Sequence, residues 1–191
     1  VTLQQAGDSG RTLRIIFRVF DDAIAFRYEW PKQAALKDFE IMDELTEFVL
    51  PSDPMTLWQP AFRPQASEQL YAKTRLSELL RQIRLAHGDA VAGDNPNLDP
   101  IKAVTTPLTL RTDDGLYLVI HEADLTDYAA MELQPEDHNT LKCDLAPWSD
   151  GVLVRASAPS VSPWRYVMIS DKLSDIVENT SAISLNLNPP S

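Results

Sequence analysis

Short segments in which apolar and polar residues alternate recur along most of the chain, a pattern typical of β-strands. Residues 13–20 and 24–30 alternate in this way on either side of Asp21-Asp22-Ala23, which predicts a β-hairpin. A turn at Asp22-Ala23 keeps the apolar residues of both strands on one face. It would set three apolar pairs across the hairpin, Val19 with Phe26, Phe17 with Tyr28 and Ile15 with Trp30.

Most of the remaining chain also reads as short strands, and two segments read as helices. The apolar spacing of Leu76, Leu79, Leu80 and Ile83 predicts one amphipathic helix over 74–87, with Thr74 as its cap. A second, short helix is expected at 171–177, and 88–100 reads as a loop. Extended segments are expected at 39–50 with a break near Asp43-Glu44, and at 56–60, 69–71, 103–111, 116–122, 128–134, 140–145, 151–156 and 164–169. Many short strands with one or two helices predict an all-β fold of the β-sandwich class.

The strand predicted at 116–122 ends with a residue that could carry chemistry. Its apolar residues occupy both faces, which indicates a strand buried on both sides. Glu122 continues the face of Leu116, Leu118 and Ile120. A buried carboxylate needs a cation, a metal ion or hydrogen-bond donors beside it. The spacing alone leaves two interpretations open: a paired or solvated Glu at the sheet rim, or a metal ligand.

Composition restricts the classes of function. The 191 residues suffice for one large domain, and no apolar run is long enough to cross a membrane. The net charge of −11 disfavours nucleic-acid and anionic-membrane partners and is compatible with a neutral sugar or a cation. The single cysteine, Cys143, excludes an intrachain disulfide and a cysteine-rich zinc site. The chain does not begin with Met and shows no signal peptide, so we expect a mature or excised fragment.

Familiar catalytic motifs are missing from the sequence. It contains no glycine-rich phosphate loop, no Gly-x-Ser-x-Gly and no His-Glu-x-x-His. Trp58 and Tyr71 could be stacking platforms for a sugar, although aromatic side chains in such strands more often serve packing. From the residues alone, the prediction is a β-sandwich domain with one notable glutamate, Glu122.

Several segments spread over nearly the whole chain carry a further signal. They are Phe17–Tyr28, Ile41–Phe48, Thr106–Thr109, Gly115–Tyr117, His121–Tyr128, Ser162–Arg165 and Leu185–Pro189. Together they resemble the N-terminal domain of glycoside hydrolase family 97, and the match is specific because the segments keep their order. The resemblance implies a supersandwich of the galactose mutarotase-like type over 1–183, followed at 184–191 by a linker toward an absent catalytic (β/α)8 barrel. Because the family has further strands before the hairpin, it also implies an incomplete sheet with an edge to be covered.

The resemblance also implies a function. Members of the family are exo-acting, calcium-dependent enzymes on α-glucosides or α-galactosides, and their catalytic carboxylates lie in the barrel. This chain would then form part of the active-site wall, would be inactive alone, and would be periplasmic or extracellular. The matched His-Glu-Ala segment makes Glu122 a calcium ligand, presented at the sheet rim so that the barrel can complete the coordination. A carboxylate suits Ca²⁺, but the isolated fragment should bind it weakly.

Ala23 departs from the pattern of the family. The family usually has Gly where Ala23 stands, and if this position needs a positive φ, Ala would cost roughly 1 kcal/mol. The chain could instead be an independent sugar-binding or mutarotase-like module, which would need an acid–base pair such as His121 with a carboxylate. It could also be a structural interaction domain that uses the exposed sheet edge. The segment 75–102 looks like an insertion whose role the sequence does not define.

Overall fold

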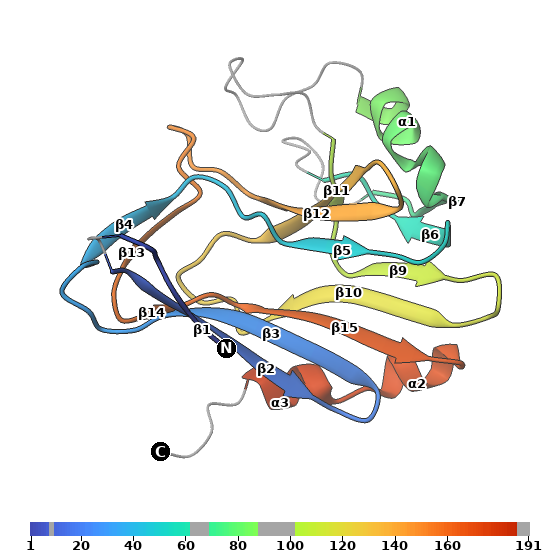
Figure 1. Ribbon diagram of the computed structural model, residues 1–191. Helices are drawn as coiled ribbons and strands as arrows, with labels where there is room; N and C mark the ends of the chain where they lie inside the picture. Colours follow the sequence, from blue (N-terminus) through green and yellow to red (C-terminus); the bar gives the residue numbers. More distant parts are fainter. Residues whose placement is uncertain (8–9, 62–68, 88–101, 187–191) are drawn as a thin grey trace.

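Most of the strands form two facing antiparallel sheets, which confirms the predicted all-β sandwich (Figure 1). The computed structural model describes residues 1–7, 10–61, 69–87 and 102–186. The larger sheet has nine strands, and the smaller sheet covers only part of it. This offset leaves Phe17 and Val19, at the end of β2, 51% and 77% exposed.

The nine-stranded sheet contains the predicted hairpin and the central strands. Its order is β1 (Thr2–Gln4), β2 (Thr12–Val19), β3 (Ala23–Trp30), β15 (Trp164–Ser170), β10 (Tyr117–Ala123), β9 (Leu108–Arg111), β6 (Met55–Trp58) and β7 (Ala72–Arg75), and β14 (Ser160–Val161) also pairs with β3. The predicted strands near 13–20, 24–30, 116–122 and 164–169 are therefore confirmed, with small shifts at their ends. The segment predicted at 103–111 is divided between two sheets, because the chain turns at Thr106-Pro107.

The smaller sheet supplies the opposite layer of the sandwich. Its order is β5 (Glu47–Val49), β12 (Thr140–Leu145), β11 (Met131–Glu136) and β8 (Val104–Thr105). A separate ribbon pairs β4 (Asp38–Ile41) with β13 (Val154–Ser157). The predicted break near Asp43-Glu44 is confirmed, because β4 ends before it and β5 begins after it. This break carries Glu44 between the two layers.

The register of the β2–β3 hairpin differs from the prediction by two residues. Phe17 faces Phe26 and Val19 faces Ile24, and the Phe20 N–H donates to the Ala23 carbonyl at 2.8 Å. The turn therefore consists of Asp21 and Asp22 rather than Asp22 and Ala23. A slip of two residues keeps every side chain on the same face, so the apolar pattern could not detect it. Ala23 begins β3 and is not among the residues with positive φ, so the anticipated strain is absent.

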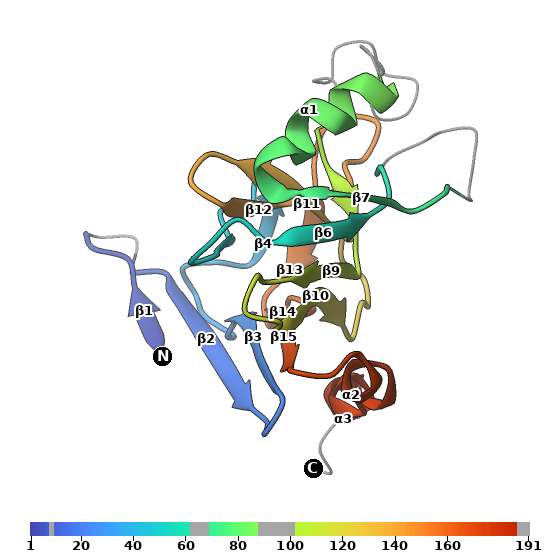
Figure 2. The same ribbon diagram turned by 90° about the vertical axis from the view of Figure 1, so that its right-hand side faces the viewer.

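Helix α1 (Leu76–His87) confirms the predicted amphipathic helix, but its N-terminus is capped differently. Thr74 lies in β7, and the Ser77 N–H donates instead to Asp53 Oδ1 at 2.8 Å. Helices α2 (Leu173–Glu178) and α3 (Ser181–Asn186) follow β15, and α3 was not predicted. Figure 2 shows α1 over β6, β7 and β11, and α2 and α3 at the opposite end of the molecule.

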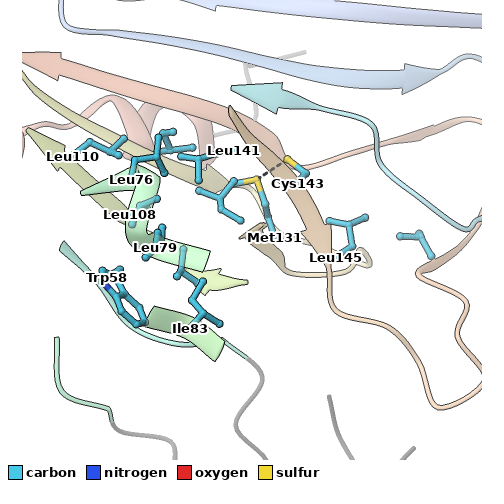
Figure 3. Packing of buried hydrophobic residues seen from close by; sticks show 14 residues of the cluster. Trp58, Leu76, Leu79, Ile83, Leu108, Leu110, Met131, Leu141, Cys143 and Leu145 are labelled. Carbon is cyan, nitrogen blue, oxygen red and sulfur yellow. Dashed lines mark hydrogen bonds between the residues drawn. The ribbon is translucent and has the colours of Figure 1, made fainter. Parts of the chain in front are cut away.

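The main core lies between the two sheets and beneath α1. Leu79 and Ile83 of α1 pack with Trp58, Leu108 and Met131 (Figure 3). Trp58 is 4% exposed, and its indole Nε1 donates to Thr74 Oγ1 at 3.0 Å. This burial supports the packing interpretation of Trp58. Tyr71, in contrast, is 58% exposed.

Two of the predicted segments lie partly or wholly outside the described residues. Ser184–Asn186, the first residues of the predicted linker, belong to α3, and the remainder lies outside the described residues. The domain boundary itself stays a prediction. The loop predicted at 88–100 also lies outside them. Among the described helices, none has the length and apolar character needed to span a membrane.

Candidate functional site

Glu122 and Arg165 face one another across the middle of the nine-stranded sheet. They are cross-strand partners on β10 and β15. Both side chains lie on the sheet face that also carries Ile120 and Val167, which packs against the smaller sheet. An acid and a base directly opposite one another on one face form a favourable cross-strand pair. Arg165 Nη1 donates to Glu122 Oε2 at 2.9 Å.

Glu44 completes a buried charge cluster around Arg165. Arg165 Nε and Nη2 donate to the two carboxylate oxygens of Glu44 at 2.8 and 2.6 Å. The side chains of Arg165 and Glu44 are 0% and 5% exposed. Burial alone lowers the pKa of Arg165, but hydrogen bonds and charge from Glu44 and the charge of Glu122 more than compensate and raise it. The planar guanidinium is therefore held charged between two carboxylates that are distant in the sequence.

The remaining oxygens of the cluster are also held by the protein. Glu122 Oε1 accepts a hydrogen bond from the Met131 N–H at 3.0 Å. Thr46 Oγ1 donates to Glu44 Oε1 at 2.9 Å, and the Tyr128 hydroxyl donates to Glu44 Oε2 at 3.5 Å. Burial, followed by the negative charge of Glu44, raises the pKa of Tyr128, so this phenol stays protonated. The cluster is thus rigid before any ligand arrives.

The electrostatic balance of the cluster favours a cation. Two carboxylates share one guanidinium, which leaves one negative charge in excess. Glu132 of β11 lies close enough for Glu122 to affect it, and burial together with the charges of Glu122 and Asp144 raises the pKa of Glu132 to about 8. Glu132 Oε2 is buried without a hydrogen-bond partner. A positive ion beside Glu122 would relieve the excess charge of the cluster.

The structure places Glu122 differently from the open carboxylate that was expected at the sheet rim. Its side chain is 8% exposed and paired with Arg165, because the register of β10 and β15 puts the two opposite one another. The interpretation of Glu122 as a paired residue is therefore correct, and calcium ligation stays a prediction. Within the described segments, no group of three or more His, Cys, Asp or Glu residues is arranged to hold a metal ion. A metal at Glu122 would need most of its ligands from outside these segments.

His121 does not provide the acid–base pair of the mutarotase-like alternative. Its Nδ1 lies 3.1 Å from Thr106 Oγ1, and its ring packs near Tyr166. Burial lowers its pKa, so the imidazole is neutral near pH 7. In the described part of the chain, no hydrogen bond or ion pair joins His121 to a carboxylate. The alternation of β10 also directs His121 and Glu122 to opposite faces of the sheet.

Sequence reasoning missed Arg165 and Glu44 as parts of the site. Arg165 is the only charged residue in the strand Trp164–Ser170. A lone arginine in an apolar strand indicates a buried ion pair, and this signal could have identified it. Glu44 has no comparable signal, because it lies in a loop rich in acidic residues.

The cluster approaches the surface through an aromatic groove. A groove of about 420 Å³ is lined by Tyr28, Trp30 and Phe39 and reaches Glu44 and Tyr128. Its volume falls within the range of roughly 300–1,000 Å³ found for small-molecule sites. Glu44 is therefore the charged residue through which the cluster borders this groove.

Comparison with known families identifies the relationship that the residues suggested. The family model described as "Glycosyl-hydrolase 97 N-terminal" matches residues 1–190. A probable retaining alpha-galactosidase of Streptomyces bingchenggensis (strain BCW-1) is 27% identical over 186 residues, which are 91% of this chain and 23% of that protein. The chain thus spans about a quarter of this relative.

Two solved structures share the fold of this chain. A glycoside hydrolase family 97 enzyme from Pseudoalteromonas sp. strain K8, in complex with acarbose, superimposes with a TM-score of 0.81 at 34% identity. The match covers 97% of this chain and 25% of that one. A β-arabinopyranosidase shares the fold alone, with a TM-score of 0.61 and 21% identity over 89% of this chain and 27% of its own.

Proposed function

The chain belongs to the N-terminal domain family of glycoside hydrolase family 97, and on this premise we propose that it serves an exo-acting α-glycosidase. The substrate would be an α-glucoside or an α-galactoside. The support comes from relatives, one named as a probable retaining alpha-galactosidase and one solved with acarbose. Since the chain spans about a quarter of these proteins, the catalytic carboxylates are expected in a separate catalytic domain. The expected periplasmic or extracellular location stays a prediction.

Within this proposal, Glu122 is the one calcium ligand that the chain supplies to a site shared with the catalytic domain. The observation that carries this role is the excess negative charge of the Glu44–Arg165–Glu122 cluster. Each oxygen of Glu122 accepts one hydrogen bond and keeps a further lone pair for a metal ion. Carboxylate oxygen is the ligand that Ca²⁺ prefers, so the residue fits the ion.

The other residues of the cluster would act on Glu122 rather than on the substrate. Arg165 fixes one oxygen of Glu122 and the Met131 N–H fixes the other, so the carboxylate has little rotational freedom to lose on binding. Such supporting hydrogen bonds commonly orient metal ligands. Glu44 in turn neutralises Arg165, which would otherwise repel a cation. Bound calcium would act as a Lewis acid at the scissile bond.

The test is the Glu122→Gln substitution in the complete protein, with Glu44→Gln as the matched control. Both variants remove one carboxylate from the same guanidinium, so both should lose thermal stability, and Glu44→Gln should lose more because Glu44 accepts two of the three hydrogen bonds of Arg165. Glu122→Gln should weaken calcium binding by tenfold or more and reduce hydrolysis of aryl α-glucosides or aryl α-galactosides. Glu44→Gln removes a neighbouring charge but no ligand oxygen, so it should weaken calcium binding clearly less. Calcium affinity would be measured by calorimetry after chelation.

Two results would contradict the proposal in different ways. Unchanged calcium affinity in the Glu122→Gln variant would remove the ligand role and leave the cluster structural. A wild-type protein that hydrolyses neither class of aryl glycoside would overturn the glycosidase itself.

A further inference from the structure

The loop between β12 and β13 presents an exposed tryptophan on a fixed backbone. The Trp148 N–H donates to the Val152 carbonyl, and the Gly151 N–H donates to the Trp148 carbonyl, both at 2.9 Å. Gly151 has φ +87°, a conformation that favours glycine. Trp148 is nevertheless 61% exposed, whereas Trp58 and Trp164 are 4% and 1% exposed. The structure therefore fixes the backbone of an aromatic side chain that it does not bury.

Arg155 lies beside this tryptophan and is held in place by two carboxylates. Its Nε donates to Glu40 Oε1 at 3.1 Å, and its Nη2 donates to Asp150 Oδ2. Among the described residues these bonds leave the two Nη1 hydrogens without a partner. Asp150 also accepts the Val152 N–H at 3.2 Å, which joins the arginine to the tryptophan loop. The guanidinium thus pairs with two carboxylates, and one of these also accepts a hydrogen bond from the loop that carries the indole.

Both side chains line a groove of about 590 Å³, whose other walls include Tyr128 and Asp127. A second groove of about 640 Å³ shares Asp127 and Arg155 with the first and continues along β4 and β13. The two grooves therefore adjoin one another at Asp127 and Arg155, and each has the volume of a small-molecule site. Tyr128 also connects the first groove to Glu44 of the buried cluster.

From this arrangement we propose that Trp148 and Arg155 bind a neutral α-linked oligosaccharide. The C–H groups on one face of a pyranose carry partial positive charge and pack on the negative face of an indole. Sugar hydroxyls can accept from the Arg155 Nη1 hydrogens and donate to the Asp127 carboxylate. The carboxylates of Asp127, Asp150 and Glu40 around the groove disfavour an anionic ligand. The choice of sugar rests on the function proposed above.

The experiment uses the complete protein labelled with 5-fluorotryptophan and ¹⁹F NMR. The Trp148→Phe variant assigns the Trp148 resonance. β-Cyclodextrin is the first probe, because it is an α-linked glucan without a chain end and cannot be hydrolysed by an exo-acting enzyme. Raffinose is the second probe and carries an α-galactosyl unit. We expect a saturable shift of the Trp148 resonance at millimolar concentrations of at least one of them.

Two substitutions then test the groove itself. Arg155→Ala should weaken the titration seen at Trp148 roughly tenfold, as expected for a fixed polar contact in a binding site. Tyr71→Ala is the matched control, because Tyr71 is an exposed aromatic residue that does not line the groove, and it should leave the titration unchanged. The other fluorotryptophan resonances report whether each variant is folded.

Failure of this inference is distinguishable from failure of the proposed function. No shift with either probe would overturn the groove, and so would a Trp148 resonance without a D₂O isotope shift, which would show that another domain covers the indole. Hydrolysis of aryl α-glycosides by the same protein, measured separately, tests the glycosidase alone.

Discussion

Replacing Arg165 by Met should destabilise the protein more than any other single exchange of a charged residue in the described segments. Methionine fills much of the space of the arginine stem but supplies no donor and no charge. Glu44 and Glu122 would then remain buried with no cation between them. Removing one partner from a buried ion pair is strongly destabilising for this reason.

The magnitude follows from the burial of the three side chains. Arg165 is 0% exposed and makes three hydrogen bonds to two carboxylates. Breaking a buried pair costs about 3–5 kcal/mol. In a domain of this length, 1 kcal/mol shifts the unfolding midpoint by about 2–4 °C. We therefore expect Arg165→Met to lower the midpoint by about 6–20 °C.

Thermal unfolding followed by circular dichroism measures this shift, and Arg155→Met is the matched control. Arg155 also pairs with two carboxylates, Glu40 and Asp150, but its side chain is 45% exposed. Solvent screens such pairs, so Arg155→Met should leave the midpoint close to that of the wild type. The two arginines differ in burial and share their type of partner, so the comparison isolates desolvation.

A compensated variant makes the reasoning refutable. Exchanging Glu44 and Glu122 for Gln together with Arg165→Met leaves no buried charge in the cluster and should recover at least half of the lost midpoint. A single variant as stable as the wild type, or a triple variant as unstable as the single one, would show that uncompensated charge is not what destabilises Arg165→Met.

Three further outcomes are expected. Burial raises the pKa of Glu132 from 4.5 to about 8, so the folded state loses stability progressively as the pH rises from 4.5 to 8. Glu132→Gln removes this loss and should raise the unfolding midpoint more at pH 8 than at pH 4.5. Burial raises the pKa of the Cys143 thiol, so Cys143 should react with a thiol reagent only after unfolding, as mass spectrometry would detect. Leu79→Ala should cost about 2–5 kcal/mol in denaturant unfolding, because Leu79 is fully buried in the main core.

The sequence predicted the strands well because their pattern arises from local geometry. The central strands carry apolar residues wherever a pleated strand turns them toward a core, and the helix α1 shows its own period. Two of the errors had local causes that the pattern could not resolve. The β2–β3 turn moved by two residues, and the cap of α1 came from Asp53 rather than from Thr74.

The candidate site was predictable only in part. Glu122 stood out because a carboxylate followed an apolar face at the end of β10. Its partners did not, since Glu44, Glu122 and Arg165 approach one another only when the strand order places β15 beside β10 and the loop after β4 returns between the sheets. Trp148 and Arg155 are close in the sequence, but the groove that they share was not predictable, because its other wall, with Asp127 and Tyr128, comes from an earlier segment of the chain.

The sequence by itself therefore determined the β-sandwich class, the faces of its strands, its amphipathic helix and its family. Only the tertiary structure decided that Glu122 is ion-paired and nearly buried, and that one arginine joins it to Glu44. Alternation is imposed on each strand by its own backbone, so it can be read residue by residue. The proximity of charges depends on strand order and register over the whole chain, and no short segment encodes either.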